Sequence, residues 1–460
     1  MYCVSRTQIN KADYPKLYAY LLNCCMLSKN LYNASLYRIR QNYTLQGKDS
    51  LSINEQEVLD EITRTQACAF LKKPGYNLSY KFLEKLMRVT HNPDFFSGLP
   101  MQSAQAAVKA ACMDFKTWLA SMKAYKKHPA DFTGKPKMPG YKKSSVAMVK
   151  FTNQDCVLRN SVLKFPKTRE TISLPHIDSC SRLKEVQVQP YYNDFIIITI
   201  YECKDSTPQA GNKPYSCGID FGVNNLAAIV GNDGSCLLYK GGVVKAANQW
   251  FNKQRAKYVS ILDRAKQPHN TNMLNSLSKN RNNFIRDYMH KVSSDIIQHC
   301  VAHEIGTIIM GKNEGWKQNS NIGKKNNQTF VSIPFSLLQQ MITYKAERAG
   351  ITVMMQEESY TSKASFLDGD VIPVHKKGCS VKQVFSGKRC SRGLYKSADG
   401  TIINADLNGA ANILRKAIPA AFDSIKDFSF MQQITVKNIK TVNPAKDIPK
   451  CIPAKRIEAA

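Results

Sequence analysis

Residues 218–228 read Gly218-Ile219-Asp220-Phe221-Gly222-Val223-Asn224-Asn225-Leu226-Ala227-Ala228, an apolar run interrupted by one acid. An acid within an apolar strand costs free energy unless it is paired or binds a cation. The glycines on either side of it would let a phosphate backbone come close. On residue types alone, a strand-end aspartate that caps the next turn is the more common case. The sequence around this motif therefore has to distinguish the two interpretations.

A regular order of strands and helices is predicted around Asp220. In chain order these are strands over 217–220, 226–230 and 236–239, helices over 244–266 and 276–304, a strand over 307–310, a helix over 334–350, a strand over 351–355 and a helix that starts near 406. The first three strands would form an antiparallel meander. This order is similar to that of an RNase H-like domain, which places acids at the ends of its elements.

A second motif with an acid at its head lies near the last helix. It reads Asp406-Leu407-Asn408-Gly409-Ala410-Ala411-Asn412-Ile413. The helix dipole favours an acid near a helix N-terminus, which would explain Asp406 but not the run behind it. Together, the two motifs resemble the first and third RuvC motifs of TnpB proteins, which are transposon-encoded, and of the related type V CRISPR effectors.

The middle acid of the resemblance is displaced in this chain. Most TnpB relatives have a glutamate at the end of the strand before the crossing helix, and the matching residue here is Gly311. In Fanzor proteins and some TnpB branches, a relocated glutamate stands three residues before a threonine, which matches Glu358 and Thr361. Glu357 would point to the opposite face of a regular strand, so which of the two is the ligand stays open. Glu314 is interpreted as an exposed loop acid.

The resemblance implies an RNA-guided DNA endonuclease that cuts double-stranded DNA matched to a guide RNA, next to a short adjacent motif. Asp220, Glu358 and Asp406 would be its catalytic residues and would hold two magnesium ions. An alternative is an RNA-guided DNA-binding regulator whose nuclease site is inactive, because Gly311 cannot bind a metal. A third is a structure-specific nuclease without RNA, which would be expected to be a shorter chain.

The resemblance also implies a multidomain α+β organisation. We expect a wedge-domain strand over 1–13, a helical recognition domain over 14–125, a wedge β-barrel over 126–212 and the first part of an RNase H-like RuvC nuclease over 213–360. A loop-rich, degenerate zinc-ribbon-like insert that binds the target nucleic acid is expected over 361–403, followed by the second nuclease part over 404–420 and a basic, flexible tail over 421–460. In many TnpB proteins the insert is a four-cysteine zinc ribbon. Here Ser365 and Asp368 stand at the first cysteine pair, and Cys390 is followed by Gly393 at the second. His375, Cys379 and Cys390 lack paired spacing, so structural zinc is not expected.

The charge of the chain predicts a polyanionic partner. Lys and Arg total 65 against 35 Asp and Glu, a formal net charge of +30. No apolar run is long enough to span a membrane, so nucleic acid is the expected partner and a membrane is not. Scattered cysteines indicate a reduced, intracellular protein, which we expect in the cytoplasm of a prokaryotic cell, near the nucleoid. The sequence predicts no oligomeric state.

A basic connector follows the N-terminal helices and is the candidate nucleic-acid-binding segment. Its lysines suit phosphate contacts and its tyrosine suits stacking on a base. A solvated basic surface is an equally simple interpretation of each residue taken singly. The candidate residues are Lys123, Lys126, Lys127, Lys135, Lys137, Tyr141, Lys142 and Lys143.

Overall fold

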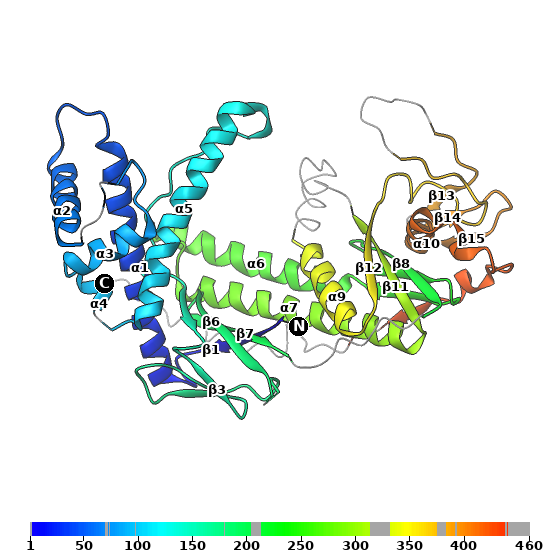
Figure 1. Ribbon diagram of the computed structural model, residues 1–460. Helices are drawn as coiled ribbons and strands as arrows, with labels where there is room; N and C mark the ends of the chain where they lie inside the picture. The colour runs from blue at the N-terminus through cyan, green and yellow to red at the C-terminus, as the bar shows by residue number, and fades with distance from the viewer. Residues whose placement is uncertain are drawn as a thin grey trace. The chain divides into compact units, whose positions relative to one another are not determined.

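The structure is a computed structural model that describes residues 2–69, 72, 74–96, 98–178, 180–203, 213–312, 332–374, 383–391, 393–437 and 439. It divides into two compact units, Met1–Asp205 and Ser206–Ala460, and each unit is described by itself. Both units combine helices with sheets, so the chain is a multidomain α+β protein, as the sequence predicts (Figure 1). Within the described residues, no helix has the length and apolar character that would let it span a membrane.

The first unit contains a group of helices around a long first helix. They are α1 (Pro15–Thr44), α2 (Ile53–Ala69), α3 (Tyr80–Val89), α4 (Pro93–Phe96) and α5 (Met101–Lys127). Leu17, Leu21, Cys24 and Leu31 of α1 are all buried, and their spacing of four, three and seven residues puts them on one face of the helix. The short helix η1 (Pro129–Asp131) follows α5. The connector then leads to strand β2, which begins at Val149.

The strands of the first unit form two antiparallel sheets. One has the order β1-β7-β6-β2 and is built from β1 (Tyr2–Ile9), β7 (Asp194–Glu202), β6 (Arg182–Tyr191) and β2 (Val149–Thr152). The other has the order β3-β4-β5, from β3 (Val157–Arg159), β4 (Val162–Lys164) and β5 (Thr171–Ser173). Because Tyr2 pairs with Glu202 and Ile9 with Phe195, the first strand of the chain belongs to the sheet of the later strands.

The second unit is built on a six-stranded sheet of order β12-β11-β8-β9-β10-β16. Its strands are β8 (Tyr215–Asp220), β9 (Asn225–Gly231), β10 (Cys236–Lys240), β11 (Ile305–Lys312), β12 (Thr352–Glu357) and β16 (Thr435–Lys437). β8, β9 and β10 form the predicted antiparallel meander, and β11 and β12 run parallel to β8. The carboxyl ends of β8, β11 and β12 therefore meet at one edge of the sheet.

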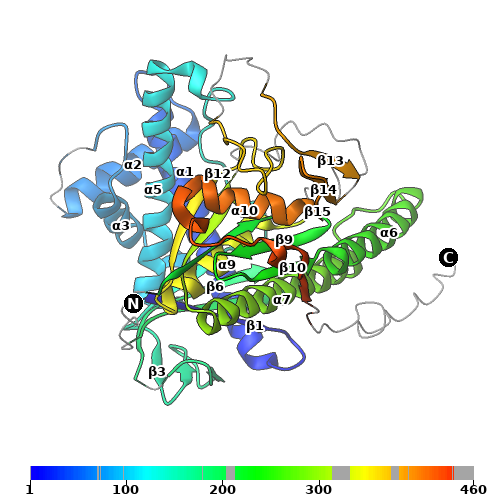
Figure 2. The same cartoon turned by 90° about the vertical axis from the view of Figure 1, so that its right-hand side faces the viewer.

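Helices cover both faces of this sheet. They are α6 (Gly242–Arg264), α7 (Asn272–Ala302), α9 (Phe335–Arg348) and α10 (Ala405–Ala417). Ile229 packs with residues of α7 and α9, whereas its neighbours Ala228 and Val230 pack with α10, as alternation along a strand requires. Figure 1 shows α10 on one side of β8 and β11 and α9 on the other, and Figure 2 shows α10 next to β9, which it contacts.

A glycine allows α10 to lie close to the central strand. A Cβ at Gly218 of β8 would collide with the carbonyl oxygen of Ala410 and lie 3.0 Å from the backbone nitrogen of Leu414. Since Asp406 lies in the first turn of α10 and β8 ends with Asp220, this close approach brings the two acids of the sequence motifs to the same region of the unit.

Two expectations about the C-terminal part differ from the structure. The insert over 361–403 is not only loops, because β13 (Lys388–Ser391), β14 (Leu394–Lys396) and β15 (Ile402–Asn404) form a three-stranded sheet. The expectation of a flexible tail is wrong for residues 421–437. There the short helices η2 (Pro419–Phe422) and η3 (Ser429–Gln432) bury Phe422 and Met431, and β16 pairs with β10. The apolar residues of 421–437 decide this structure despite the lysines nearby, because their burial completes the hydrophobic core that includes α10. Most of the tail beyond 437 lies outside the described residues.

Candidate active site

Three carboxylates come together at the edge of the sheet where the parallel strands end. Asp220 is the last residue of β8, Glu358 directly follows β12, and Asp406 lies in the first turn of α10. Burial raises the pKa of Asp220 well above its ordinary value, and the negative charges of Glu358 and Asp406 raise it further. A charge acts on a pKa in this way only from nearby, so the three predicted acids share one site.

Asp406 is fixed in place by two asparagines. The side-chain oxygen of Asn404 accepts hydrogen bonds from the backbone nitrogens of Asp406 and Leu407, at 2.9 and 3.2 Å, and so caps α10. The side-chain nitrogen of Asn225, the first residue of β9, donates to Oδ2 of Asp406 at 2.7 Å. Sequence analysis assigned no role to Asn225, although it belongs to the motif that contains Asp220.

Gly409 makes room for Asp220 against α10. A Cβ at position 409 would lie 2.7 Å from Oδ2 of Asp220. Any larger side chain there would have to displace the Asp220 carboxylate or the helix. The glycine in the second motif thus belongs to the construction of the site.

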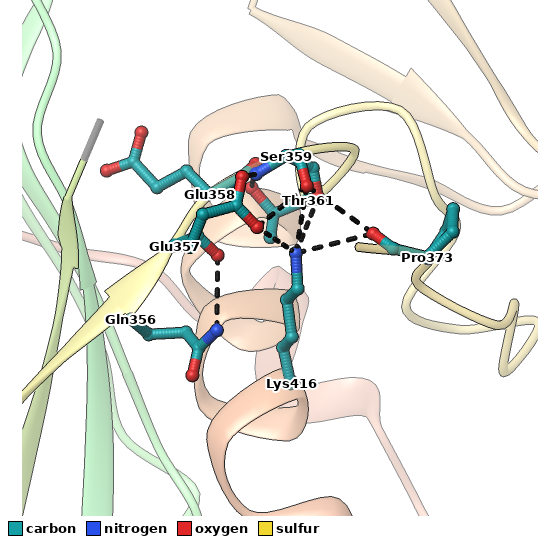
Figure 3. A network of polar contacts seen from close by, with 7 residues as sticks. All are labelled: Gln356, Glu357, Glu358, Ser359, Thr361, Pro373 and Lys416. Carbon is teal, nitrogen blue, oxygen red and sulfur yellow. Dashed lines mark hydrogen bonds and ion pairs between the residues drawn. The ribbon is translucent and has the colours of Figure 1, made fainter. Parts of the chain in front are cut away.

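Glu357 and Glu358 point in different directions, as Figure 3 shows. Glu357 forms an ion pair of 2.8 Å with Lys416 of α10 and accepts hydrogen bonds from the backbone nitrogen and the hydroxyl of Ser359, both at 2.7 Å. Burial opposes ionisation of Glu357, but these hydrogen bonds outweigh it and lower its pKa. Glu358 points away from Lys416, and its backbone oxygen accepts hydrogen bonds from the nitrogen and the hydroxyl of Thr361. Lys416 therefore engages Glu357 and not Glu358.

The carboxylate of Glu358 occupies the space that a side chain at position 311 would fill. A Cβ built on Gly311 would lie 2.7 Å from Cδ and 2.8 Å from Cγ of Glu358. Gly311 lies near the end of β11 and pairs with Gln356 of β12, so the two positions are neighbours across the strands. A glutamate at 311 and one at 358 would thus compete for the same volume. Glu314, the other candidate, lies outside the described residues.

Comparison with known proteins gives matches on both sides of this site. A family model described as a probable transposase (OrfB_IS605) matches residues 199–317, which contain Asp220, and one described as the TNB domain of Cas12f1-like proteins matches residues 335–413, which contain Glu358 and Asp406. A TnpB-like protein of Acidianus two-tailed virus is 28% identical over 225 residues, which are 47% of this chain and 44% of that protein. Over these segments the chain is similar to proteins of the TnpB family.

Other relatives are more distant. The CRISPR-associated endodeoxyribonuclease Cas12f2 of a Micrarchaeota archaeon is 26% identical over 220 residues, 45% of this chain and 38% of that protein. The chain thus spans less than half the length of the two curated relatives. Among solved structures, a Cas12f1–sgRNA–target DNA complex has a TM-score of 0.46 at 13% identity, covering 88% of this chain and 84% of that one. A CRISPR-Cas12f ternary complex has a TM-score of 0.33 at 13% identity, with coverage of 88% and 83%.

Hydrogen bonds hold the start of the insert, where many TnpB proteins have the cysteines of a zinc ribbon. The carboxylate of Asp370 accepts from the backbone nitrogen of Ser365, at 2.8 Å, and from the hydroxyl of Ser386, at 2.6 Å. Asp368 accepts from the backbone nitrogen of Ala398 at 3.0 Å. These contacts join residues 365–370 to the two later parts of the insert. Cys390 is exposed, and His375 and Cys379 lie outside the described residues.

Arg389, in the insert, is a cation that acts on Asp220. It lies on β13, and its positive charge opposes the rise in the pKa of Asp220. Its positive charge near Asp220 would let it contact a phosphate held at the same site.

The candidate nucleic-acid residues lie in the first unit. Lys123, Lys126 and Lys127 are exposed at the end of α5, and Lys135, Lys137, Tyr141 and Lys143 are exposed on the connector. Lys142 differs, because its ammonium lies 3.8 Å from the ring centre of Tyr32 and burial lowers its pKa. The backbone of Lys142 also exchanges two hydrogen bonds with the side chain of Asn33. Lys142 therefore anchors the connector on α1.

Two buried asparagines of α10 tie the segment after Glu358 to the helix. Asn412 donates to the backbone oxygens of Thr361 and Ala364, at 2.9 and 2.7 Å. Asn408 donates to Ala364 at 2.9 Å and accepts from the backbone nitrogen of Phe366 at 3.0 Å. Both side chains are fully buried. Their spacing of four residues puts them on one helix face, which the sequence alone shows, but their partners become visible only in the fold.

We expect Asn412→Ala to lower the free energy of unfolding by about 1–3 kcal/mol, because it removes the donor to the buried oxygen of Thr361. Denaturant titration of the full chain measures this. The control is Asn283→Ala, at an exposed position of α7. This change of asparagine to alanine raises the helix propensity by the same amount as Asn412→Ala does. Equal stability of the two variants would show that the asparagine ties are not needed.

Proposed function

We propose that this chain is an RNA-guided DNA endonuclease that cleaves double-stranded DNA matched to a guide RNA, next to a short adjacent motif. Asp220, Glu358 and Asp406 would form its single nuclease site. The observation that carries the proposal is the position of Glu358: its carboxylate fills the side-chain space of Gly311 and its charge, with that of Asp406, raises the pKa of Asp220.

The carboxylates of the site fit magnesium. All three predicted ligands offer only oxygen, which magnesium prefers, and the mutual repulsion that raises the pKa of Asp220 is relieved when a cation binds among them. Two bound magnesium ions would activate water and stabilise the leaving 3′ oxygen. The chain itself orients the ligands: Asn225 holds Oδ2 of Asp406, and Thr361 holds the backbone of Glu358.

The order of the strands supports an RNase H-like nuclease fold. In the order β10-β9-β8-β11-β12, an antiparallel meander is extended by two strands parallel to its first strand, and helices connect them. This arrangement puts Asp220 at the end of the central strand and Glu358 after the edge strand, so that their side chains can converge. One of the curated relatives supports the same interpretation, since it is named a CRISPR-associated endodeoxyribonuclease.

The proposed partners are a guide RNA and a DNA duplex. A net charge of +30 favours binding to phosphates, and six of the eight candidate residues are lysines exposed on α5 or the connector. In RNA-guided nucleases, base pairing selects the target while the protein contacts the backbone of the hybrid. The helices and sheets of the first unit would then serve as the recognition and wedge domains.

A nuclease-inactive DNA-binding regulator is the alternative that Gly311 would favour. Loss of the middle glutamate without replacement would leave two acids, which is too few for a pair of closely spaced ions. The carboxylate of Glu358 in the same space argues against it. The two functions differ in one result, cleavage of a guide-matched DNA.

We expect Glu358→Gln to lower the rate of cleavage of guide-matched DNA at least ~100-fold in magnesium, since even the loss of groups that only orient metal ligands costs about 10–100-fold. Glutamine keeps the shape of the side chain and removes its charge, so binding of the target should be unchanged. Asp220→Asn and Asp406→Asn should behave in the same way. Single-turnover cleavage and a binding assay on the same complex measure both quantities.

The matched control is Glu357→Gln, one residue away and engaged by Lys416. It should keep cleavage within about tenfold of the unchanged protein. If Glu357→Gln abolishes cleavage and Glu358→Gln does not, the assignment of the middle ligand is wrong. If the unchanged protein binds guide-matched DNA but does not cut it, whichever divalent ion is added, the regulator is the better interpretation.

A second expectation concerns the RNA. Replacing Lys126 and Lys127 together by glutamate should weaken RNA binding and make the log–log dependence of affinity on salt less steep by about one to two units, because each lysine that neutralises a phosphate releases about 0.7–0.9 of a counterion. Replacing both by arginine keeps the charge and should leave the slope unchanged. A slope that is flat for the unchanged protein would contradict binding through phosphates.

A further inference from the structure

A second cluster of potential metal ligands lies in the second unit, and the proposed nuclease does not use it. It consists of Asp233, His299 and His303, whose ligand atoms all lie within 4.8 Å of one another. Asp233 lies in the turn between β9 and β10, and the two histidines lie at the C-terminal end of α7. We propose that Asp233, His299 and His303 bind one zinc ion that fastens the β9–β10 turn to the end of α7.

The two histidines are arranged as ligands of one ion. They are four residues apart, and the backbone nitrogen of His303 donates to the oxygen of His299 at 3.0 Å, so the last helical turn sets both rings on one side. The ring centres are 4.0 Å apart with an angle of 38° between the planes. Two protonated imidazoles at this distance would repel each other, whereas two neutral imidazoles can bind a shared cation.

His299 is the buried histidine of the cluster. Burial lowers its pKa to about 4, and the neighbouring charge of His303 lowers it further. The charge of Asp233 acts in the opposite direction and raises the pKa of His299. Lys437 and Asp295 also act on it, in opposite directions, and they pair with each other at 3.6 Å.

The turn is built around the carboxylate of Asp233. Its side chain is only 6% exposed. Oδ1 accepts hydrogen bonds from the backbone nitrogen and the hydroxyl of Ser235, at 3.2 and 2.7 Å, and Gly231 leaves the space, since a Cβ there would lie 3.2 Å from Cγ of Asp233. Oδ2 faces Nδ1 of His303 at 2.7 Å. One oxygen is thus held by the turn while the other is directed at the imidazoles.

The donor set selects zinc in preference to magnesium. Two imidazole nitrogens and one carboxylate oxygen are ligands that zinc takes at ~2.0–2.2 Å, with a fourth position left for water or a hydroxyl. The hydroxyl of Ser235, 3.2 Å from Nε2 of His299, is close enough to serve there. His303 is 46% exposed, so an ion can enter from solvent.

The location indicates a structural role. Cys217 at the start of β8 pairs with Gly231, whereas Asp220 at its end pairs with Ala228. The turn after Gly231 therefore lies at the end of the sheet opposite to the three carboxylates, next to the point where α7 leads into β11. An ion there would join the meander to the strand that carries Gly311. This differs from the expectation, based on the insert, that the chain carries no structural zinc.

Zinc binding by the full chain, purified without a polyhistidine tag and treated with EDTA, tests the proposal. In excess magnesium, which saturates the oxygen-only site, the chain should take up one zinc per molecule and raise its melting temperature. Cobalt(II) in place of zinc should give the visible absorption of a tetrahedral site. His303→Ala changes a half-exposed residue that does not hold the core, and it should weaken zinc binding about 10-fold or more. Asp233→Asn, which keeps the side-chain shape, should do the same.

The matched control is His269→Ala. His269 is also exposed and also lies 2.7 Å from an aspartate, Asp263, but its pair has no second histidine in the described cluster. This variant should bind zinc like the unchanged protein. If the unchanged protein binds no zinc, Asp233 and His303 are only a hydrogen-bonded pair. If His303→Ala binds as much zinc as the unchanged protein and Cys390→Ser binds none, the ion belongs to the insert. Either result overturns the proposal.

Discussion

Repulsion among three carboxylates at one edge of a sheet is the constraint around which the second unit is built. Glu358 and Asp406 act on the pKa of Asp220, which is also raised by burial. Such a cluster destabilises a fold unless surrounding contacts hold it. Here those contacts are the cap of α10 by Asn404, the hydrogen bond from Asn225, and the close approach of α10 to β8 at Gly218. A site that costs stability and is nevertheless held this firmly is expected to bind a cation.

The choice between the two adjacent glutamates shows where prediction from the sequence ends. Alternation along a strand indicates that Glu357 and Glu358 face opposite ways, and the sequence shows this much. It does not show which way each faces, because that depends on Lys416, which lies in α10 and pairs with Glu357. The loss of a glutamate at Gly311 and the presence of one at Glu358 are likewise separate facts in the sequence. Their relation becomes visible only in the fold, where β11 and β12 lie side by side and Glu358 enters the side-chain space of Gly311.

Local patterns predicted most of what depends on neighbours in the chain. The meander, the two long helices and the buried face of α1 follow from periodicity, and Asp220 and Asp406 follow from compact motifs. Features that join distant segments were missed. Residues 421–437 were expected to be a loose tail but supply β16 and buried apolar side chains, and Asp233 meets two histidines at the far end of α7. In each case the residues have no local pattern that distinguishes them from surface residues.

An exchange of the two positions that share one space tests most directly whether Glu358 has replaced the glutamate missing at 311. Glu358→Gly alone should abolish cleavage of guide-matched DNA, and adding Gly311→Glu to it should restore cleavage, because the new carboxylate enters the volume that the old one left. Gly311→Glu alone should lower the melting temperature, since two side chains would then compete for that volume. If the double variant folds with an unchanged melting temperature and binds target DNA but is as inactive as Glu358→Gly, the two positions are not equivalent and the account of the site is wrong.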